Sequence, residues 1–174
     1  MTKVFIGGSR RISRLDDDVR HRLDRIIEKH LPILVGDANG ADKAVQEYLR
    51  SKAYGLVEVF CSGGTCRNNT GGWPVRTVAA KNRTRRDFSF YATKDRAMAD
   101  EATVGLMLWD RESFGTLMNV LRLIRRHKKV AVYVAPDHEF VDVKTESDWE
   151  QFLSRCAGEL RQRMERQSVV EQIG

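Results

Sequence analysis

The sequence predicts an α/β fold: a doubly wound, mainly parallel sheet of five strands, with helices on both faces and a C-terminal helix. Apolar segments alternate with amphipathic helical ones five times along the chain, as doubly wound sheets require. The segment 104–109 is too continuously apolar for a half-exposed strand, which indicates burial on both faces. A chain of 174 residues with 41% hydrophobic content suits a single domain spanning 1–174.

Each predicted strand is a short apolar run that ends at a glycine, a proline or a polar loop. An alternating segment at 138–145 predicts an extra short strand after the fifth. The five main strands are expected at 3–6, 33–35, 56–61, 104–109 and 129–134.

The predicted helices show apolar side chains at helical spacing. The first carries Asp16–Asp18 at its start and Lys29 in its last turn, which complements the helix dipole. The last begins at a capping box, Ser147–Glu150, and covers 147–167. The others are expected at 41–49, at 93–102 with Thr93 as its cap, and at 116–126.

Residues 62–92 are expected to form a long basic loop. Within 62–86 lie six of the 30 basic residues and no acidic one, whereas the rest of the chain is balanced. Such a segment suits a phosphorylated ligand or a nucleic-acid backbone, and it equally suits a solvated loop. Arg67, Asn68, Asn69 and Trp73 offer phosphate donors, amide donors and a stacking surface.

The cysteine and histidine spacings predict no metal site. Cys61, Cys66 and Cys156 form no even framework and lack a second zinc-ligand pair, so we expect free thiols. His21 and His30 are expected on helix surfaces. No apolar run approaches the roughly 20 residues that cross a bilayer, and the N-terminus resembles no signal peptide. We therefore expect a cytoplasmic protein with no cofactor and no membrane partner.

Three loops follow predicted strands and would meet at the carboxyl edge of the sheet. They are 7–10, 36–42 and 110–116, and the last two lead into helix N-termini, whose free N–H groups favour anions. The alternative to ligand binding is that Ser113, Asp37 or Asn39 only caps the helix that follows. The candidate phosphate- and ligand-binding residues are Gly8, Ser9, Arg10, Gly36, Asp37, Gly40, Asp42, Arg96, Ser113, Gly115 and Thr116.

Arg96 belongs to this set for an electrostatic reason. Lys94 and Arg96 lie near the start of the predicted helix 93–102, where cations oppose the helix dipole. Such a cost is expected where the cations face an anion or an acidic neighbour. Exposed charge without a role is the alternative.

The motifs VFIGGSR, GDANGADKAV, KDRAM and AxxGLMLWDRESFGT, followed by a helix and KVAVYV, resemble the SLOG superfamily over about residues 3–135. That group includes proteins related to the Lonely Guy phosphoribohydrolases and DprA. The resemblance implies a Rossmann-like fold, a nucleotide-derived ligand and, often, homo-oligomerisation. It is a resemblance in motif order, carried by short motifs.

The catalytic pattern of the Lonely Guy enzymes matches only in part. Their Pro-Gly-Gly-x-Gly-Thr-x-x-Glu segment corresponds to residues 111–119, where Gly115 and Thr116 match and Asn119 replaces the carboxylate. Their Arg-Lys pair corresponds to Lys94-Asp95 before Met98. Asn cannot carry the charge that stabilises an oxocarbenium-like centre. The acids that would have to substitute are Asp37, Asp42, Asp110 and Glu112.

These observations favour binding or sensing of a nucleotide-derived phosphate ligand, of the nucleoside monophosphate, NAD or ADP-ribose type. The alternative is an N-glycosidase acting on nucleoside 5′-monophosphates, with Asp42, Asp110 or Glu112 as the catalytic carboxylate. A weaker alternative is single-stranded nucleic-acid binding through Arg67, Trp73, Arg76 and Arg83.

Overall fold

One seven-stranded sheet runs through the protein in the computed structural model, which describes residues 1–79 and 88–173. The strand order is β4-β3-β2-β1-β5-β6-β7, with β7 antiparallel to β6 and all other neighbours parallel. The predicted α/β, doubly wound, mainly parallel sheet is confirmed, but the count of five strands was wrong. The strands are β1 (Val4–Gly8), β2 (Ile33–Gly36), β3 (Val57–Ser62), β4 (Val75–Val78), β5 (Val104–Trp109), β6 (Lys129–Val134) and β7 (Glu139–Val143).

The two additional strands form the edges of the sheet. β4 lies inside the segment expected as a loop, where Val59 of β3 pairs with Val75. Its side chains are mostly exposed, so it lacks the apolar signal that marks the buried strands. β7 matches the extra strand expected at 138–145 and joins the same sheet beside β6.

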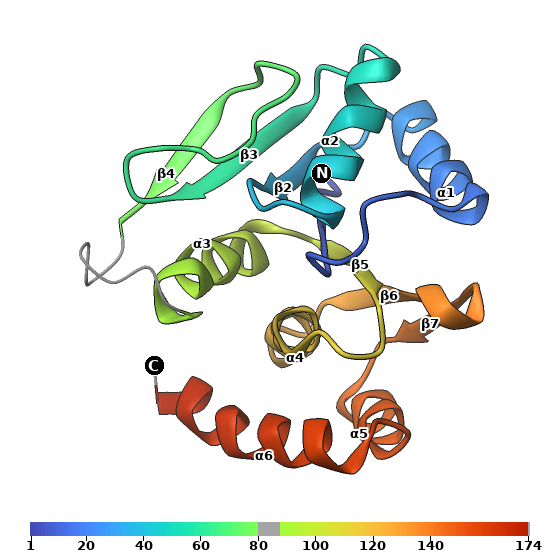
Figure 1. Ribbon diagram of the computed structural model, residues 1–174, viewed down its shortest axis with the longest axis vertical. Helices are drawn as coiled ribbons and strands as arrows, with labels where there is room; N and C mark the ends of the chain where they lie inside the picture. Colours follow the sequence, from blue (N-terminus) through green and yellow to red (C-terminus); the bar gives the residue numbers. More distant parts are fainter. Residues whose placement is uncertain (80–87, 174) are drawn as a thin grey trace.

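Helices cover both faces of the sheet (Figure 1). α1 and α2 pack on one face, and α3 and α4 pack on the other, each over its own hydrophobic cluster. α5 and α6 form a further layer against α4 (Figure 1). None of the helices in 1–79 and 88–173 is long and apolar enough to cross a membrane. The helices are α1 (Asp17–Glu28), α2 (Ala41–Ser51), α3 (Phe88–Glu101), α4 (Phe114–Arg125), α5 (Glu146–Ser154) and α6 (Gly158–Ile173).

Two helix predictions need correction. Thr93 does not cap α3, because the helix begins at Phe88 and the Thr93 hydroxyl donates to the carbonyl of Ser89, 3.1 Å away. The C-terminal helix expected over 147–167 is two helices, α5 and α6. The capping box starts at Thr145 rather than Ser147: the Thr145 hydroxyl accepts from the Asp148 N–H at 3.1 Å, and the Asp148 carboxylate accepts from the Thr145 N–H.

The sheet topology determines where a ligand can approach the backbone. The chain builds β2, β3 and β4 on one side of β1 and then crosses to the other side, where β5 pairs with β1. The connections leaving β1 and β5 therefore diverge at their carboxyl ends, which opens a crevice at this switch point. The Ser9 hydroxyl donates to the Asp110 carboxylate at 2.7 Å, so the two loops touch at its base.

Candidate functional site

A cavity of about 480 Å³ lies at this switch point. Its walls come from β1 and the loop after it, the start of α2 and the loop before it, Arg67 of the segment after β3, α3, the loop between β5 and α4 with the start of α4, and one side chain of α6. Its volume lies within the range of roughly 300–1,000 Å³ that small-molecule sites occupy. The predicted site residues that line it are Gly8, Ser9, Arg10, Asp42, Asp110, Glu112, Ser113, Gly115 and Thr116.

The other four predicted site residues lie outside the cavity lining. Gly40 has φ +83°, and a Cβ there would lie 2.2 Å from the Arg10 carbonyl oxygen, so this glycine lets two loops pack closely. A Cβ on Gly36 would lie 2.5 Å from the Asp42 carboxylate, so Gly36 leaves room for that side chain. Asp37 and Arg96 make ion pairs of their own, described below. These four residues support the surrounding structure and do not line the cavity.

A buried charge cluster adjoins the cavity, which Lys94, Asp95 and Asp42 line. Lys94 is only 4% exposed, and its Nζ lies 3.2 Å from the Asp95 carboxylate and 3.9 Å from that of Asp37. Burial alone would lower the Lys94 pKa, but the surrounding carboxylates of Asp95, Asp42 and Asp37 outweigh it and raise that pKa. Lys94 thus faces acidic neighbours, one of the alternatives left open by the sequence, although it lies inside α3 rather than at its start.

Asp42 has a different electrostatic environment from the other candidate carboxylates. It is buried, and this burial raises its pKa to about 6 although Lys94 acts in the opposite direction. Its carboxylate accepts the Ala38 N–H at 3.1 Å. A carboxyl group with this pKa can both hold and release a proton near neutral pH.

Asp110 joins the loop after β1 to the loop before α4. Its carboxylate accepts from the Ser9 hydroxyl and the Ser113 N–H, both at 2.7 Å, and from the Glu112 N–H at 3.0 Å. Burial acts to raise the pKa of Asp110, but these hydrogen bonds outweigh burial and lower that pKa below its ordinary value. The group therefore stays ionised. Glu112 pairs with Arg11 at the surface. Asp42 is therefore the candidate carboxylate best suited to acid–base chemistry.

The N-terminus of α4 is capped and still partly open. The Ser113 hydroxyl accepts from the Thr116 N–H at 3.4 Å and from the Thr116 hydroxyl at 2.9 Å, so the capping alternative holds for Ser113. Gly115 has no atom within 4 Å of the position that a Cβ would take. A ligand group can therefore approach the backbone of this first helical turn at Gly115.

Two arginines bring positive charge to the cavity without a carboxylate partner among the described residues. The Arg10 guanidinium lies 5.3 Å from the centre of the Tyr91 ring, and that of Arg163 lies 3.9 Å from the centre of the Phe114 ring. Arg163 was not among the residues predicted from the sequence, because no motif or periodic pattern marks it. Its position depends on how α6 packs against α4, where the Met164 side chain is buried.

Arg96 holds α6 in this position. Its Nε and Nη2 each donate to the Glu171 carboxylate at 2.9 Å, and the buried Arg122 donates to the same carboxylate at 2.8 Å. Burial raises the pKa of Glu171, but both arginines lower it more strongly, to about 2. Of the alternatives that the sequence left open for Arg96, the structure shows an acidic neighbour, and that neighbour belongs to the protein rather than to a ligand.

Asn119 connects this ion cluster to the cavity. Its amide nitrogen donates to the Asp95 carboxylate at 3.2 Å, and its carbonyl oxygen accepts from Arg122 at 2.8 Å. Only an amide makes both bonds. A carboxylate at this position would face that of Asp95, so the residue that departs from the Lonely Guy pattern fits its surroundings here.

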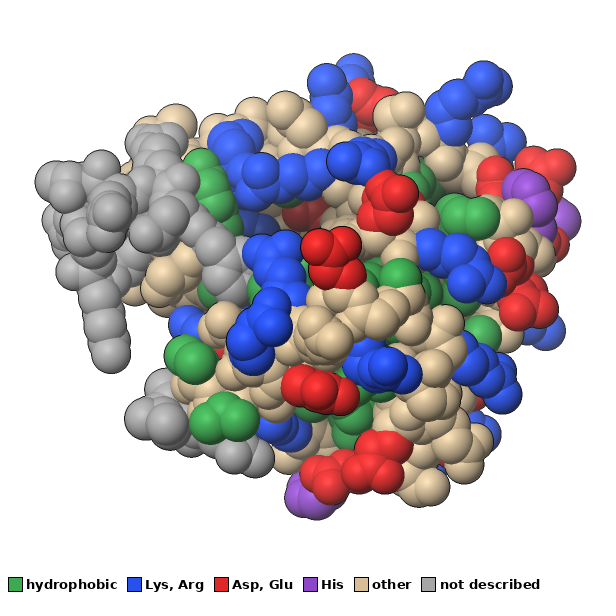
Figure 2. All heavy atoms as spheres, turned by 60° about the horizontal axis from the view of Figure 1, so that its bottom comes forward, with side chains coloured by type: hydrophobic (Ala, Val, Ile, Leu, Met, Phe, Trp, Pro, Cys, Tyr) green, Lys and Arg blue, Asp and Glu red, His purple; other side chains and the backbone are tan. Residues whose placement is uncertain are grey.

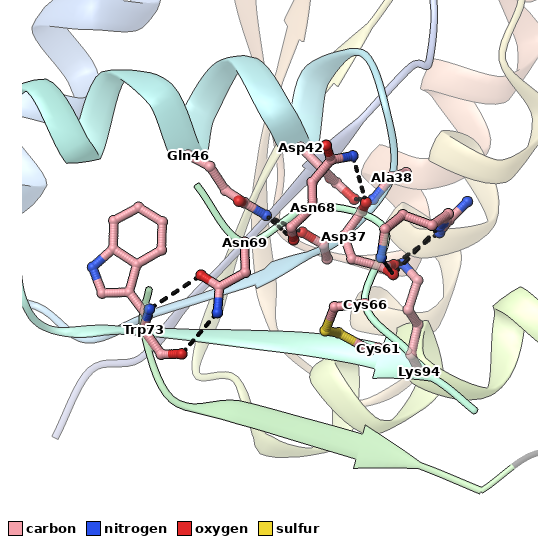
Figure 3. Close-up of a disulfide and its surroundings, with 12 residues drawn as sticks. Asp37, Ala38, Asp42, Gln46, Cys61, Cys66, Asn68, Asn69, Trp73 and Lys94 are labelled. Atoms are coloured by element: carbon pink, nitrogen blue, oxygen red, sulfur yellow. Dashed lines mark hydrogen bonds and ion pairs between the residues drawn. A yellow bond between two sulfur atoms is a disulfide. The ribbon is translucent and has the colours of Figure 1, made fainter. Parts of the chain in front are cut away.

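The described part of the basic segment, residues 62–79, makes mainly structural contacts. Trp73 is 8% exposed, and its indole N–H donates to the Tyr54 carbonyl at 2.8 Å, so it presents no stacking surface. Asn69 exchanges two hydrogen bonds with the Trp73 backbone (Figure 3). Arg76 pairs with Glu58 and Glu101. The remaining basic residues, Lys81, Arg83, Arg85 and Arg86, lie outside the described residues.

Cys61 and Cys66 form a disulfide, which corrects the expectation of free thiols (Figure 3). Their Cα atoms lie 5.2 Å apart. Spacing alone did not reveal this pairing, because it depends on a turn between the cysteines that carries no periodic signal. Cys156 is free, as expected.

No protein-family model matches the chain, and no curated protein matches it significantly. The resemblance to the SLOG superfamily remains a prediction.

Proposed function

We propose that the protein binds a small nucleotide-derived phosphate ligand, of the nucleoside monophosphate, NAD or ADP-ribose type, in the cavity between β1 and β5. One observation carries this proposal: the same cavity contains two arginines without carboxylate partners among the described residues, and carboxylates that can accept hydroxyl groups. A nucleotide offers both an anionic group and sugar hydroxyls.

The residues that line the cavity suggest which part of such a ligand each of them contacts. Arg10, Arg163 and the open backbone at Gly115 favour the phosphate. Asp42 suits a sugar hydroxyl, since the hydrogen-bonding capacity of Asp110 is largely used by the protein. Tyr91 adds an aromatic surface to the wall.

A small ligand fits better than a long nucleic acid. The buried Trp73 removes the expected stacking platform. Figure 2 shows Lys and Arg side chains interspersed with Asp and Glu on the visible face, whereas backbone-tracking proteins present a continuous positive groove. A ligand of this kind also agrees with our proposal of a cytoplasmic protein.

Cleavage of the ligand is the second candidate function, and Asp42 is the observation that favours it. A carboxyl group with a pKa of about 6 inside the cavity is suited to donate a proton to a leaving base. The activity would be hydrolysis of the N-glycosidic bond of a nucleoside 5′-monophosphate.

The experiment that tests both functions uses a panel of nucleoside monophosphates, NAD and ADP-ribose. Thermal shift reports binding, and chromatography after long incubation reports free base. We expect at least one ligand to stabilise the protein and to be recovered intact. Release of base that requires Asp42 would replace binding by cleavage, and the absence of any stabilising ligand would contradict both.

A further inference from the structure

The end of β3 brings two cysteines together beside the cavity. Cys61 lies within the strand and is fully buried, whereas Cys66 is half-buried and follows the exposed residues Gly64 and Thr65. Gly63, with φ +74°, allows the chain to reverse between them. The separation of 5.2 Å between their Cα atoms is normal for a disulfide. An external thiol reagent can therefore reach the pair through Cys66.

The residue after Cys66 belongs to the cavity wall. The Arg67 N–H donates to the Asp37 carboxylate at 2.9 Å, and its Nη2 donates to the other carboxylate oxygen at 2.8 Å. Its guanidinium lies 4.2 Å from the centre of the Tyr91 ring. Arg67 and Tyr91 both line the cavity. The disulfide is thus attached, one residue away, to a charged element of the ligand site.

The chain on the two sides of Arg67 is held by different interactions. After it, the Asn68 amide donates to the Asp37 carbonyl at 2.9 Å, and Gln46 donates to the Asn68 carbonyl at 3.2 Å (Figure 3). Before it, the Gly63 N–H donates to the Val78 carbonyl at 3.2 Å, and residues 64–65 are exposed. Between Gly63 and Arg67, the disulfide therefore adds a covalent constraint on the approach from β3.

We propose that Cys61 and Cys66 are a reversible thiol–disulfide modification site whose oxidation fixes Arg67 in the cavity wall and thereby strengthens ligand binding. The effect on the ligand rests on the proposed function, whereas the effect on Arg67 does not. Cys66 is half-buried and residues 64–65 before it are exposed, so the bond is accessible to exchange with an external thiol.

The oxidant is a small-molecule disulfide such as glutathione disulfide. The Cys66 thiolate attacks one of its sulfurs, forming a mixed disulfide and releasing one glutathione. The Cys61 thiolate then attacks the Cys66 sulfur and releases the second glutathione. Two protein thiols lose two electrons and two protons, and glutathione disulfide becomes two glutathione molecules.

A metal site is the competing use of the same residues. One ligand atom each from Asp37, Cys61 and Cys66 lies within 4.8 Å of the others. The Asp37 carboxylate, however, is already bound by Arg67 and lies 3.9 Å from the Lys94 ammonium. Two cations beside the same carboxylate disfavour the binding of a metal ion to it, so the geometry favours the redox site.

The first test needs no ligand. Amide hydrogen exchange at Arg67 is measured after treatment with dithiothreitol or with glutathione disulfide. We expect exchange about tenfold faster in the reduced protein, because freeing the turn promotes local opening. Cys66→Ser should behave as the reduced protein under both conditions, and Cys156→Ser should behave as wild type. Equal exchange in the oxidised and reduced forms would overturn the proposal.

The second test measures AMP affinity by calorimetry in both forms. We expect binding several-fold tighter in the oxidised protein and no redox response in Cys66→Ser. Equal affinities with a normal exchange response would overturn the link to binding. If neither form binds any member of the nucleotide panel, the proposed function fails, while the exchange result still decides whether oxidation fixes Arg67. Zn²⁺ binding by the reduced protein that Asp37→Asn abolishes would replace the redox site with a metal site.

Discussion

Asp42 shows how burial tunes one carboxyl group of the cavity. Its raised pKa of about 6 means that it changes charge near neutral pH. If a ligand hydroxyl donates to it, only the ionised form is a full acceptor. We therefore predict that AMP affinity rises as pH increases from about 5 to 7, measured by calorimetry. Asp42→Asn should remove most of this dependence, and an unchanged pH profile in that variant would exclude Asp42 from ligand contact.

Arg163 gives a prediction that separates phosphate from the rest of the ligand. Arg163→Ala should weaken AMP binding about tenfold, or about 1.4 kcal/mol, because a charged hydrogen bond is lost. Adenosine, which lacks the phosphate, should bind equally to both proteins. Arg166→Ala is the matched control, since Arg166 lies on α6 but outside the cavity lining. Equal losses for AMP and adenosine would mean that Arg163 supports the site without contacting phosphate.

At the level of elements, α6 packs on α4 through Met164 and is also held by an ion cluster centred on Glu171. Glu171 accepts from Arg96 of α3 and from the buried Arg122 of α4. Removing its charge leaves a buried guanidinium without a counterion, which is costly. We predict that Glu171→Gln lowers the free energy of unfolding by about 2 kcal/mol in urea denaturation. Glu165→Gln, exposed on the same helix, should change it little.

The same ion cluster predicts an acid dependence of stability. The pKa of Glu171 is about 2 in the folded protein, below the ordinary value of 4.5. The stabilisation is therefore present above the ordinary pKa and is lost as pH falls toward the folded one. The difference in unfolding free energy between wild type and Glu171→Gln should shrink over this interval. A difference that stays constant would show that the carboxylate charge is not the stabilising feature.

Elements differed in how far the sequence predicted them. The buried strands and amphipathic helices carry strong periodic signals, and their order along the chain indicated the doubly wound sheet. β4 was missed because an exposed edge strand of four residues needs no apolar run. α3 was expected to start at Thr93, although the helix already begins at Phe88. α5 ends where the Arg155 N–H donates to the Phe152 carbonyl at 3.1 Å and the Cys156 N–H donates to the Leu153 carbonyl at 3.0 Å. The apolar spacing continues across this break and therefore does not reveal it.

At the level of the whole molecule, the position of the site was predictable and its full lining was not. Parallel strands align their carboxyl ends, so loops at 7–10 and 110–116 had to meet. Arg163, Arg67 and the disulfide reach the site only through the packing of α6 and the turn after β3. Such contacts join residues far apart in the sequence and leave no local pattern.

The substitution of Gly115 tests the central claim most directly. A Cβ there would meet no atom within 4 Å. An aspartate at this position places a negative charge in the first turn of α4, which favours the helix but repels an anion in the cavity. Calorimetry with AMP should show binding to wild type and to the uncharged control Gly115→Asn, and none to Gly115→Asp, with unchanged melting temperatures. AMP binding by Gly115→Asp equal to that of wild type would contradict an anion site at this edge of the sheet.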